Sequence, residues 1–504
     1  MCGIYAHLRK SKPLPPQFLH HRGPDNHGMV AFPDAVLAHT RLAIVGDATE
    51  SQPFLAGDNE ALTINGEIYN HALLRQEAAP YPFHTRSDCE VVLPLLRDGG
   101  IANIARLDGV FAFVYAKDNR FIVARDAIGV VPLYFCVLPE GDVLVASERK
   151  AITGKDRSVQ IFPPGHAFDG KRWTRWYRAP LAPFRASTPD KDVLRALLVS
   201  AIKKRTMADV EYGVLLSGGL DSTIVATVAS SLSKTRLKSF SIGLKGSPDL
   251  DHARRVAKAI GTDHHEVHFT LEEGLAALPH VVRSIETVDV TTIRASTPMW
   301  LLAQYIRKHT DVKMVLSGEG ADEALCGYLY FHESPTPEAA ALESAAKVEA
   351  LHRFDCQRAN KSMMAHGIEC RVPFLDLDVL NYVMRLPGAA KAPIRGIEKH
   401  LLRRAFEGVI DDGVCWRQKE QFSDGVGYGW IDAMKALADA YPVQPTQNLF
   451  QEAPVSKEQA MIMHMFEKAL PFECSTVPCD NWTPSWQKNK DPSGRASNVH
   501  EKSV

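Results

Sequence analysis

A change of residue pattern near residue 190 constrains the fold of this chain more than any other feature. Residues 2–180 contain short apolar runs separated by turn signals, whereas residues 191–470 alternate apolar strands with helical stretches. Pro180, Pro183 and Pro189 mark residues 181–190 as a linker. Residues 471–504 are polar, so we expect a poorly ordered tail there. The pattern therefore predicts two folded domains in a chain of 504 residues.

The first domain is predicted to consist of antiparallel β-sheets stacked into a sandwich. Strands are expected over residues 111–116 and 121–125, because the turn dipeptide Asp118-Asn119 lies between them. Another strand is expected over residues 143–147. Short strands with few helical stretches between them favour sheets that pack face to face.

The second domain is predicted to be a doubly wound α/β domain with a parallel sheet. Helices are expected over residues 191–205, 223–232 and 251–260, and strands over residues 213–216, 239–244 and 312–316. This alternation places helices on both faces of a parallel sheet. Ligands bind such sheets at the carboxyl ends of the strands, near a reversal in strand order. Gly-rich turns at residues 217–222 and 317–323 follow strands and are expected at that edge.

Composition excludes several classes of protein. The formal net charge is −1 and the pI is about 7.0, so the sequence predicts no binding to nucleic acid or to an anionic membrane. No apolar run reaches the length of roughly 18 residues that a membrane span needs. Residues 10–16 are polar and proline-rich where a signal peptide would be apolar. Nine cysteines without a disulfide framework fit a reducing compartment, so we expect a cytoplasmic protein.

Cys2 is the first candidate for chemistry, because it directly follows the initiator Met1. Aminopeptidase normally removes Met1 before so small a residue, which predicts that Cys2 becomes the amino terminus. A thiol titrates near ~8.5 and an α-amine near ~8. The amine of an amino-terminal Cys can therefore take the proton of its own thiol, which combines nucleophile and base in one residue.

Six further motifs follow Cys2 in a characteristic order. They are His21-Arg22-Gly23-Pro24-Asp25, His39-Thr40-Arg41-Leu42, Asn65-Gly66-Glu67-Ile68-Tyr69-Asn70, Ser87-Asp88-Cys89-Glu90, Ser217-Gly218-Gly219-Leu220-Asp221-Ser222 and Ser317-Gly318-Glu319-Gly320-Ala321-Asp322-Glu323. The set resembles the glutamine-hydrolysing asparagine synthetases over nearly the full length. The resemblance implies an N-terminal-nucleophile (Ntn type) glutaminase domain over residues 2–180. It also implies an ATP-pyrophosphatase-type synthetase domain over residues 191–470.

Glutamine hydrolysis needs an oxyanion hole and a clamp for the amino-acid head group. Asn65 can supply a side-chain N–H and Gly66 a backbone N–H to the developing oxyanion. Arg41 can hold a carboxylate with its planar fork, and Glu67 and Asp88 can hold an ammonium. The resemblance places glutamine at Arg41, Asn65, Glu67 and Asp88. The alternative is that Asn65-Gly66 is only a hairpin turn and that Arg41 and Asp88 are surface charges.

The turn at residues 217–222 is a candidate phosphate site. Its glycines and the following helix N-terminus can direct N–H groups at one anion. No Gly-Lys-Ser/Thr follows, so it is not a Walker motif. It resembles the pyrophosphate loop of enzymes that split ATP into AMP and pyrophosphate. The resemblance implies Mg²⁺ ligands at Asp221 and Asp322 and ATP contacts at Leu215, Ser217, Gly218, Gly219, Asp221, Ser222, Ile242, Ser317 and Gly318.

The same resemblance assigns the second reaction. Glu319 can accept a proton from ammonia that attacks an acyl-adenylate, and Thr291 and Arg294 lie in a segment implicated in that step. Lys419 matches a lysine near the phosphates, where a cation stabilises departing pyrophosphate. Three departures from some relatives stand out, at Arg86, Ala321 and Cys326.

The predicted enzyme condenses L-aspartate with ATP to β-aspartyl-AMP and pyrophosphate, and ammonia from glutamine then gives asparagine and AMP. The predicted partners are these small molecules and a second copy in a homodimer. Two alternatives remain: a relative with another carboxylate acceptor, and a catalytically silent glutamine- or ATP-binding regulator.

Two smaller motifs invite a metal interpretation. Cys474 and Cys479 form a single pair, whereas zinc sites usually need two pairs or a His pair. Residues 264–268 lack the spacing of the helical zinc signature, and their alternation favours a strand with solvated histidines.

Overall fold

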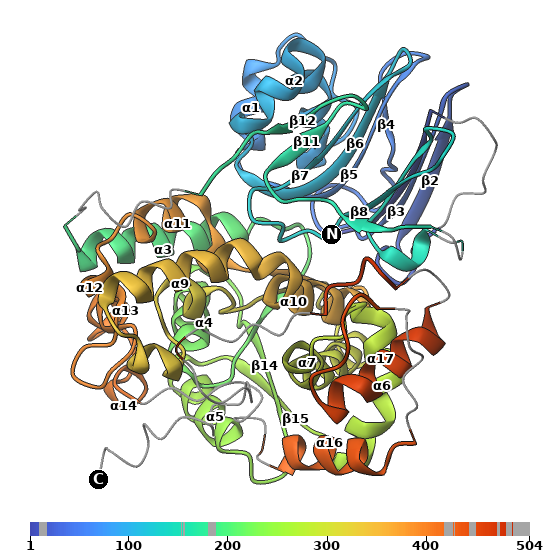
Figure 1. Cartoon of the computed structure of the whole chain (residues 1–504). Helices are drawn as coiled ribbons and strands as arrows, with labels where there is room; N and C mark the ends of the chain where they lie inside the picture. The colour runs from blue at the N-terminus through green and yellow to red at the C-terminus, as the bar shows by residue number, and fades with distance from the viewer. Residues whose placement is uncertain are drawn as a thin grey trace.

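The computed structural model describes residues 1–9, 18–152, 154, 157–179, 188–417, 427, 429–442, 450–470, 474–479 and 486. The amino-terminal domain is built on two sheets that lie face to face (Figure 1). All strand pairings among their described residues are antiparallel, so the predicted sandwich is confirmed.

Each sheet has six strands within the described residues. The first runs in the order β10 (Gln160–Ile161), β8 (Tyr134–Val137), β9 (Val143–Ala146), β1 (Gly3–Leu8), β3 (Ala35–Arg41) and β2 (Asn26–Ala31). The second runs in the order β12 (Trp173–Arg175), β11 (His166–Phe168), β7 (Arg120–Arg125), β6 (Gly109–Lys117), β5 (Glu60–Ile68) and β4 (Phe54–Leu55). The predicted hairpin is β6–β7, and Asp118 and Asn119 both take the positive φ that such a turn requires.

The alternation of side chains along β6 explains how the second sheet is covered on both faces. Val110 and Val114 belong to the core that also contains Ile4 of β1, between the two sheets. Phe111 instead packs with Leu93 of α2 (Val92–Gly99) on the outer face. Helix α1 (His71–Glu77) and α2 were not expected from the sequence, and they close this face.

The second domain contains the predicted parallel sheet. Its order among described residues is β15 (Asp263–His268), β14 (Lys238–Gly243), β13 (Tyr212–Leu215), β16 (Met314–Leu316) and β17 (Glu369–Arg371). All four pairings are parallel. Strand order reverses between β13 and β16, so both Gly-rich turns follow strands that flank the switch point.

Helices cover both faces of this sheet, which confirms the doubly wound α/β prediction (Figure 1). Val214 and Leu316 pack with α3 (Lys191–Arg205), α4 (Leu220–Leu232) and α5 (Pro248–Ile260). Phe240 and Val315 pack with α6 (Leu271–Ile285), α7 (Val290–His309) and α10 (Asp355–Met364). The remaining described helices are α8 (Ala321–Ala324), α9 (Pro337–Ala350), α11 (Leu377–Val383), α12 (Gly388–Lys391), α13 (His400–Phe406), α14 (Asp412–Cys415), α16 (Gly429–Ala440) and α17 (Lys457–Ala469).

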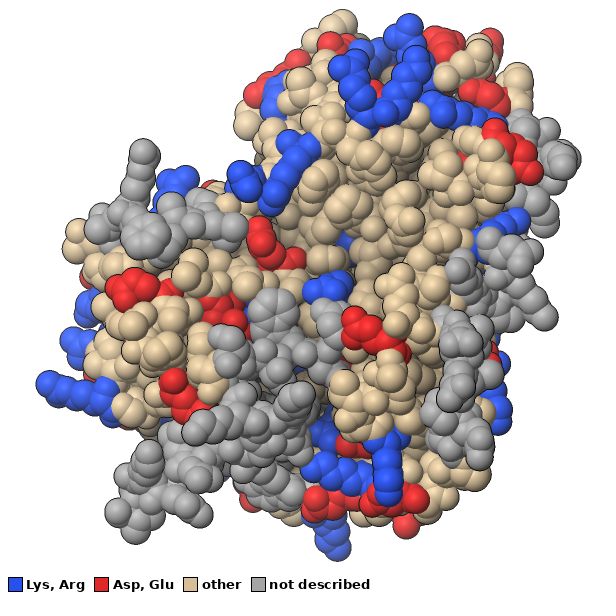
Figure 2. All heavy atoms as spheres, in the orientation of Figure 1, with Lys and Arg blue, Asp and Glu red and all other residues tan. Residues whose placement is uncertain are grey.

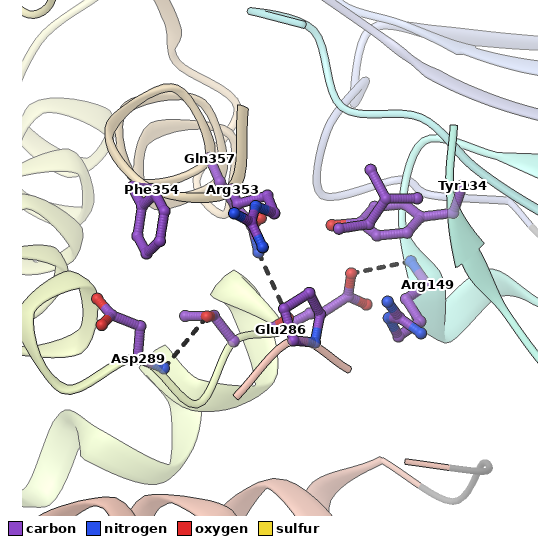
Figure 3. A pocket seen from close by; sticks show the side chains of 10 residues that line it. Tyr134, Arg149, Glu286, Asp289, Arg353, Phe354 and Gln357 are labelled. Carbon is purple, nitrogen blue, oxygen red and sulfur yellow. Dashed lines mark hydrogen bonds between the residues drawn. The ribbon is translucent and has the colours of Figure 1, made fainter. Parts of the chain in front are cut away.

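A pocket lies at the boundary between the domains (Figure 3). Tyr134 and Arg149 line it from the first domain, and Arg353 and Gln357 line it from the second. Between them, the buried Glu286 carboxylate accepts the backbone N–H groups of Arg149 and Lys150, at 2.8 and 2.7 Å. None of the described site residues predicted from the sequence lines this pocket. Glu286 thus connects the two domains through these hydrogen bonds.

Part of the expected tail is packed rather than poorly ordered. Cys474 is buried, Thr476 accepts a hydrogen bond from Arg149 at 2.9 Å, and the Trp486 ring nitrogen donates to the carbonyl of Tyr330 at 3.2 Å. These contacts reach both domains because Arg149 belongs to the first and Tyr330 to the second. The expected linker lies mostly outside the described residues.

The surface carries both signs of charge, in keeping with a formal net charge of −1. In the face drawn in Figure 2, acidic and basic side chains are intermingled. None of the helices that the structure describes combines the length and the apolar character needed to cross a membrane.

Candidate functional site

Cys2 lies immediately before β1 and is almost fully buried. Its backbone N–H donates to Asn65 Oδ1 at 2.6 Å, and Arg22 Nε donates to its carbonyl at 2.9 Å. Burial raises the pKa of the Cys2 thiol, against the opposing effect of the terminal ammonium. Met1 is present in this structure, and its buried ammonium pairs with Glu369, so the nitrogen of Cys2 is an amide here.

Asn65 and Gly66 lie in the middle of strand β5, which corrects the alternative that they form a hairpin turn. Gly66 has φ +157°, and a Cβ there would lie 2.1 Å from the carbonyl oxygen of Val110. The close approach that demands glycine is thus to the neighbouring strand β6. The Asn65 side chain holds Cys2 through Oδ1, while Nδ2 lies 3.5 Å from Ser147 Oγ.

Glu67 and Asp88 are both 3% exposed, so they are not surface charges. Asp88 Oδ2 accepts the Ile68 N–H at 2.6 Å, and burial raises its pKa. Glu67 Oε2 lies 2.9 Å from Arg371 Nη2. This contact lacks the alignment of a hydrogen bond, and Oε2 has no hydrogen-bond partner among the described residues. A buried acceptor of this kind fits a site that receives a cationic ligand group.

Arg41 is also buried, at 3% exposure, but its guanidinium faces the loop that follows β3. It donates to the carbonyl of Val45 at 3.1 Å and to the carbonyls of Asp47 and Glu50. In this structure Arg41 therefore organises the loop over residues 45–50. Arg86 is exposed, and its backbone N–H donates to Glu50 Oε1 at 2.9 Å.

The predicted phosphate turn has the expected strand–turn–helix geometry between β13 and α4. Gly218 has φ +76°, and a Cβ there would lie 2.5 Å from the backbone nitrogen of Ala253. Ser217 and Ser222 close the turn through a 3.1 Å contact between their hydroxyl oxygens. A Cβ on Gly318 would lie 2.9 Å from the Cβ of Asp221, so the second Gly-rich turn packs directly against the first.

Asp221 and Asp322 are brought together by Lys399, a residue that sequence reasoning missed. Its Nζ lies 2.6 Å from Asp221 Oδ2 and 2.6 Å from Asp322 Oδ1, and its side chain is 1% exposed. Lys399 has φ +54° at the start of α13, in the left-handed region that non-glycine residues rarely adopt. Asp221 Oδ1 is buried without a hydrogen-bond partner among the described residues. Two neighbouring carboxylates, one of them with this unused oxygen, fit a site for a divalent cation.

The other residues predicted for the nucleotide site lie near the carboxyl ends of the strands. Leu215 and Ile242 stand near the carboxyl ends of β13 and β14, and Ser317 follows β16. Glu319 pairs with Arg358 of α10, which also pairs with Asp355 at 2.7 Å. Burial raises the pKa of Glu319, and Arg358 opposes this.

The departures at Ala321 and Cys326 are both buried. Cys326 has φ +52°, in the left-handed region that favours glycine.

Arg294, predicted to belong to the synthetase site, has its partner in a different helix. It forms a buried ion pair with Glu458 of α17, with Nε 3.0 Å from Oε1. Thr291 lies in the first turn of α7, whose N-terminus is capped by Asp289. Lys419 lies outside the described residues.

The smaller motifs show no metal-ligand geometry among the described residues, because no cluster of three or more suitable His, Cys, Asp or Glu side chains occurs there. Cys474 and Cys479 are both buried, and the Cys479 thiol lies 3.4 Å from the carbonyl oxygen of Val477. Residues 263–268 form β15, as expected, but His264 contacts Ser239 and Ser241 and is only partly exposed.

Comparisons with known proteins match both halves of the chain. A family model described as "Asparagine synthase" matches residues 193–347 and 333–471, and one described as "Glutamine amidotransferase domain" matches residues 1–164. "Asparagine synthetase [glutamine-hydrolyzing] 2" of Arabidopsis thaliana is 44% identical and covers 99% of this chain and 94% of its own. "Asparagine synthetase B [glutamine-hydrolyzing]" of Escherichia coli (strain K12) is 41% identical, with 99% of each chain covered.

Solved structures give a more distant likeness. The glutamine phosphoribosylpyrophosphate amidotransferase of B. subtilis matches with a TM-score of 0.31 and 17% identity. The match covers 53% of this chain and 81% of that one.

Proposed function

The chain belongs to the family of glutamine-hydrolysing asparagine synthetases, and from this premise we propose how its two sites divide the reaction. It is a glutamine-dependent ligase that makes L-asparagine from L-aspartate and L-glutamine, with ATP as a further substrate. Cys2 carries out the glutaminase step, and the turns after β13 and β16 carry out the synthetase step.

The glutaminase step begins when removal of Met1 frees the Cys2 amine. The amine takes the thiol proton, and the thiolate attacks the side-chain carbonyl carbon of glutamine. The Asn65 Nδ2 and Gly66 backbone N–H groups face the resulting oxyanion. Ammonia leaves with a proton returned from the amine, and water then hydrolyses the γ-glutamyl thioester to glutamate and restores the thiol.

The head group of glutamine is held by charges of both signs. Glu67 and Asp88 bind its ammonium, and their burial strengthens this contact relative to water. Arg41 binds its carboxylate or shapes the loop over residues 45–50 that contacts it. Burial of all three groups supports a clamp rather than scattered surface charges.

The synthetase step activates aspartate. Its β-carboxylate oxygen attacks the α-phosphorus of ATP, which forms β-aspartyl-AMP and breaks the bond to pyrophosphate. N–H groups of residues 217–222 and the N-terminus of α4 hold the phosphates. Lys419 is proposed to face the pyrophosphate as well. Leu215, Ile242, Ser317 and Gly318 line the nucleoside.

Mg²⁺ is proposed as the cofactor of this site. Asp221 and Asp322 would hold it, and it would neutralise phosphate charge. Ammonia released at the first site then attacks the acyl carbon of β-aspartyl-AMP. Glu319 accepts the excess proton as AMP leaves. Ammonia reaches this site through the protein interior.

The observation that carries the proposal is the 2.6 Å contact between the Cys2 nitrogen and Asn65 Oδ1, which joins nucleophile and oxyanion residue. The test is a product balance from glutamine, aspartate and ATP. Asparagine, glutamate, AMP and pyrophosphate should form in equal amounts when the two sites are coupled. ADP and phosphate in place of AMP and pyrophosphate would contradict adenylation. A product other than asparagine would identify another carboxylate acceptor.

A further inference from the structure

Strand β17 belongs to the synthetase sheet, yet its two charged side chains lie among residues of the glutaminase domain. Glu369 and Arg371 are two positions apart, so they point to the same side of the strand. Both are at most 1% exposed. Glu369 pairs with the chain's terminal ammonium, and Arg371 pairs with Glu67. Thus β17 is the edge at which the synthetase sheet reaches the glutamine site.

The Arg371 guanidinium is fixed from several directions. Its Nη1 donates to the carbonyls of Arg205 and Met207, at 2.9 and 2.5 Å, and its Nε donates to Glu369 Oε1 at 2.5 Å. These bonds leave Nη2 2.9 Å from Glu67 Oε2, at the distance of an ion pair. A planar guanidinium held at two nitrogens has little freedom at the third. The fixed position of Nη2 therefore holds a positive charge beside one oxygen of Glu67.

The electrostatic surroundings of Glu67 make this contact important. Burial raises the pKa of Glu67, Arg371 is the strongest influence that lowers it, and Glu369 and Asp88 raise it further. The terminal ammonium also lowers it, but more weakly than Arg371 does. Without Arg371, Glu67 would face two other buried carboxyl groups, and its pKa would rise still further. A protonated Glu67 cannot form the charge-assisted contact that the ammonium of glutamine needs.

We propose that Arg371 is a positioning residue for glutamine: from across the domain boundary it holds the Glu67 carboxylate in place for the ammonium of the substrate. The inference rests on the proposed role of Glu67 in the glutaminase site. The synthetase domain thus completes the glutamine site through one side chain. The backbone of Arg371 has a separate task, because its carbonyl accepts the Ser317 N–H of the nucleotide turn at 2.9 Å. Side-chain variants leave that bond in place.

The test measures glutamine affinity by calorimetry in a Cys2→Ala background, where no turnover occurs and no Cys2 thiol titrates. Adding Arg371→Met should weaken glutamine binding about tenfold to a hundredfold, the worth of a charge-assisted contact. The defect should shrink as the pH rises, because a higher pH favours the ionised form of Glu67. Adding Arg371→Lys should restore part of the affinity, since it keeps the charge and loses the fork. Unchanged affinity in both variants would overturn the proposal.

A double-mutant cycle with Glu67→Gln is the decisive test. If Arg371 acts through Glu67, Arg371→Met or Arg371→Lys should cause no further loss in the Glu67→Gln background. An equal loss in both backgrounds would show a merely structural role. Arg403→Met is the matched control, because Arg403 forms a buried ion pair with Glu398 at 3.3 Å. It should leave glutamine affinity and its pH dependence unchanged.

The result separates this inference from the proposed function. With Cys2 intact, Arg371→Met should keep ammonia-dependent asparagine synthesis within about twofold of the unmodified enzyme, since the Ser317–Arg371 backbone bond remains. Failure of Cys2→Ala to abolish glutamine hydrolysis would refute the proposed glutaminase. Normal binding by Glu67→Gln would refute only the role of Glu67 and the inference that rests on it.

Discussion

Lys399 shows how a single buried residue can prepare a site for a different cation. Two carboxylates from different turns would repel each other in a partly buried site, and the Lys399 ammonium holds both. Its left-handed backbone is a strained conformation that the surrounding fold must maintain. A cation already bridges Asp221 and Asp322 in this structure, so a divalent ion would take over part of an existing interaction.

Lys399→Met should therefore lower stability in the absence of Mg²⁺. Removing one partner from a buried ion pair costs about 3–5 kcal/mol, and partial exposure of the two aspartates places the expected loss at the lower end. Thermal unfolding with increasing Mg²⁺ should show a larger gain for the variant than for the unmodified chain. Lys457→Met is the control, because its pair with Asp439 is exposed. Equal Mg²⁺ responses in all three proteins would contradict the prediction.

Cys2→Ala should abolish glutamine-dependent asparagine synthesis and leave ammonia-dependent synthesis, because only the first step needs a thiolate. Asparagine formed from each nitrogen source is the measurement. Cys136→Ala, which removes another buried thiol from the sheet that contains β1, should retain both activities. Glutamine-dependent synthesis at the normal rate in the Cys2 variant would refute the nucleophile assignment.

Glu319→Gln should bind ATP normally but lose asparagine formation, since it keeps the shape of the turn and removes the proton acceptor. Direct ATP binding and product formation are measured side by side. A loss of ATP binding equal to the loss of synthesis would instead indicate a structural role for the pair with Arg358.

The roles of individual residues were predictable where a single local motif contains the groups that the reaction needs. Cys2, Asn65, Glu67, Asp88, Asp221, Asp322 and Glu319 could be proposed from sequence, and the structure buries or pairs each of them. Arg371, Lys399 and Arg358 could not be found this way. Each pairs with a carboxylate that is distant in the sequence, and no local spacing of residues predicts such an ion pair.

At the scale of elements, the sequence predicted best where periodicity was long. The helix expected over residues 191–205 has those bounds in the structure, and Asp190 caps it. Strand β17 was missed because three residues carry no period, and its charged side chains contradict the pattern of a buried strand. Those charges find their partners in each other, in the terminal ammonium and Glu67 of the first domain, and in the carbonyls of Arg205 and Met207.

The turn between β13 and α4 offers a paired test of this local geometry. Gly218→Ala should destabilise the protein by about 1–3 kcal/mol, because φ is +76° and the new Cβ would lie 2.5 Å from the α5 backbone. Gly219→Ala should change stability little, since its nearest contact would be Ser217 Oγ at 3.4 Å. Chemical denaturation without nucleotide is the measurement. Equal stabilities of the two variants would refute the strained-turn argument.

At the scale of the whole molecule, buried charges join the two domains. Glu286 has φ +60° at the end of α6, and its carboxylate accepts two backbone N–H groups of the first domain (Figure 3). The Lys361 ammonium pairs with the same carboxylate. Sequence gave no sign of this contact, because its strength depends on burial that exists only when the domains are docked. The interface is therefore expected to depend on pH.

The sign of that dependence follows from the pKa of Glu286. Burial acts to raise it, but Lys361 and Lys150 lower it below its ordinary value of 4.5. A carboxyl group whose pKa is lower in the folded state than in the unfolded state stabilises the fold at pH values above its unfolded-state pKa. That contribution is lost as the pH falls through the folded pKa. Acidification below about 4.5 should thus weaken the contact between domains.

Glu286→Gln should consequently be less stable than the unmodified chain at pH 7, by about 3–5 kcal/mol, because Lys361 is left buried without its counter-ion. The gap between the two melting temperatures should narrow as the pH falls below 4.5, since the unmodified carboxylate then becomes neutral too. Glu77→Gln, which breaks an exposed pair with Arg106, should differ little from the unmodified chain at any pH. A gap that stays constant from pH 7 to pH 3.5 would show that packing at Glu286, and not its charge, holds the domains together.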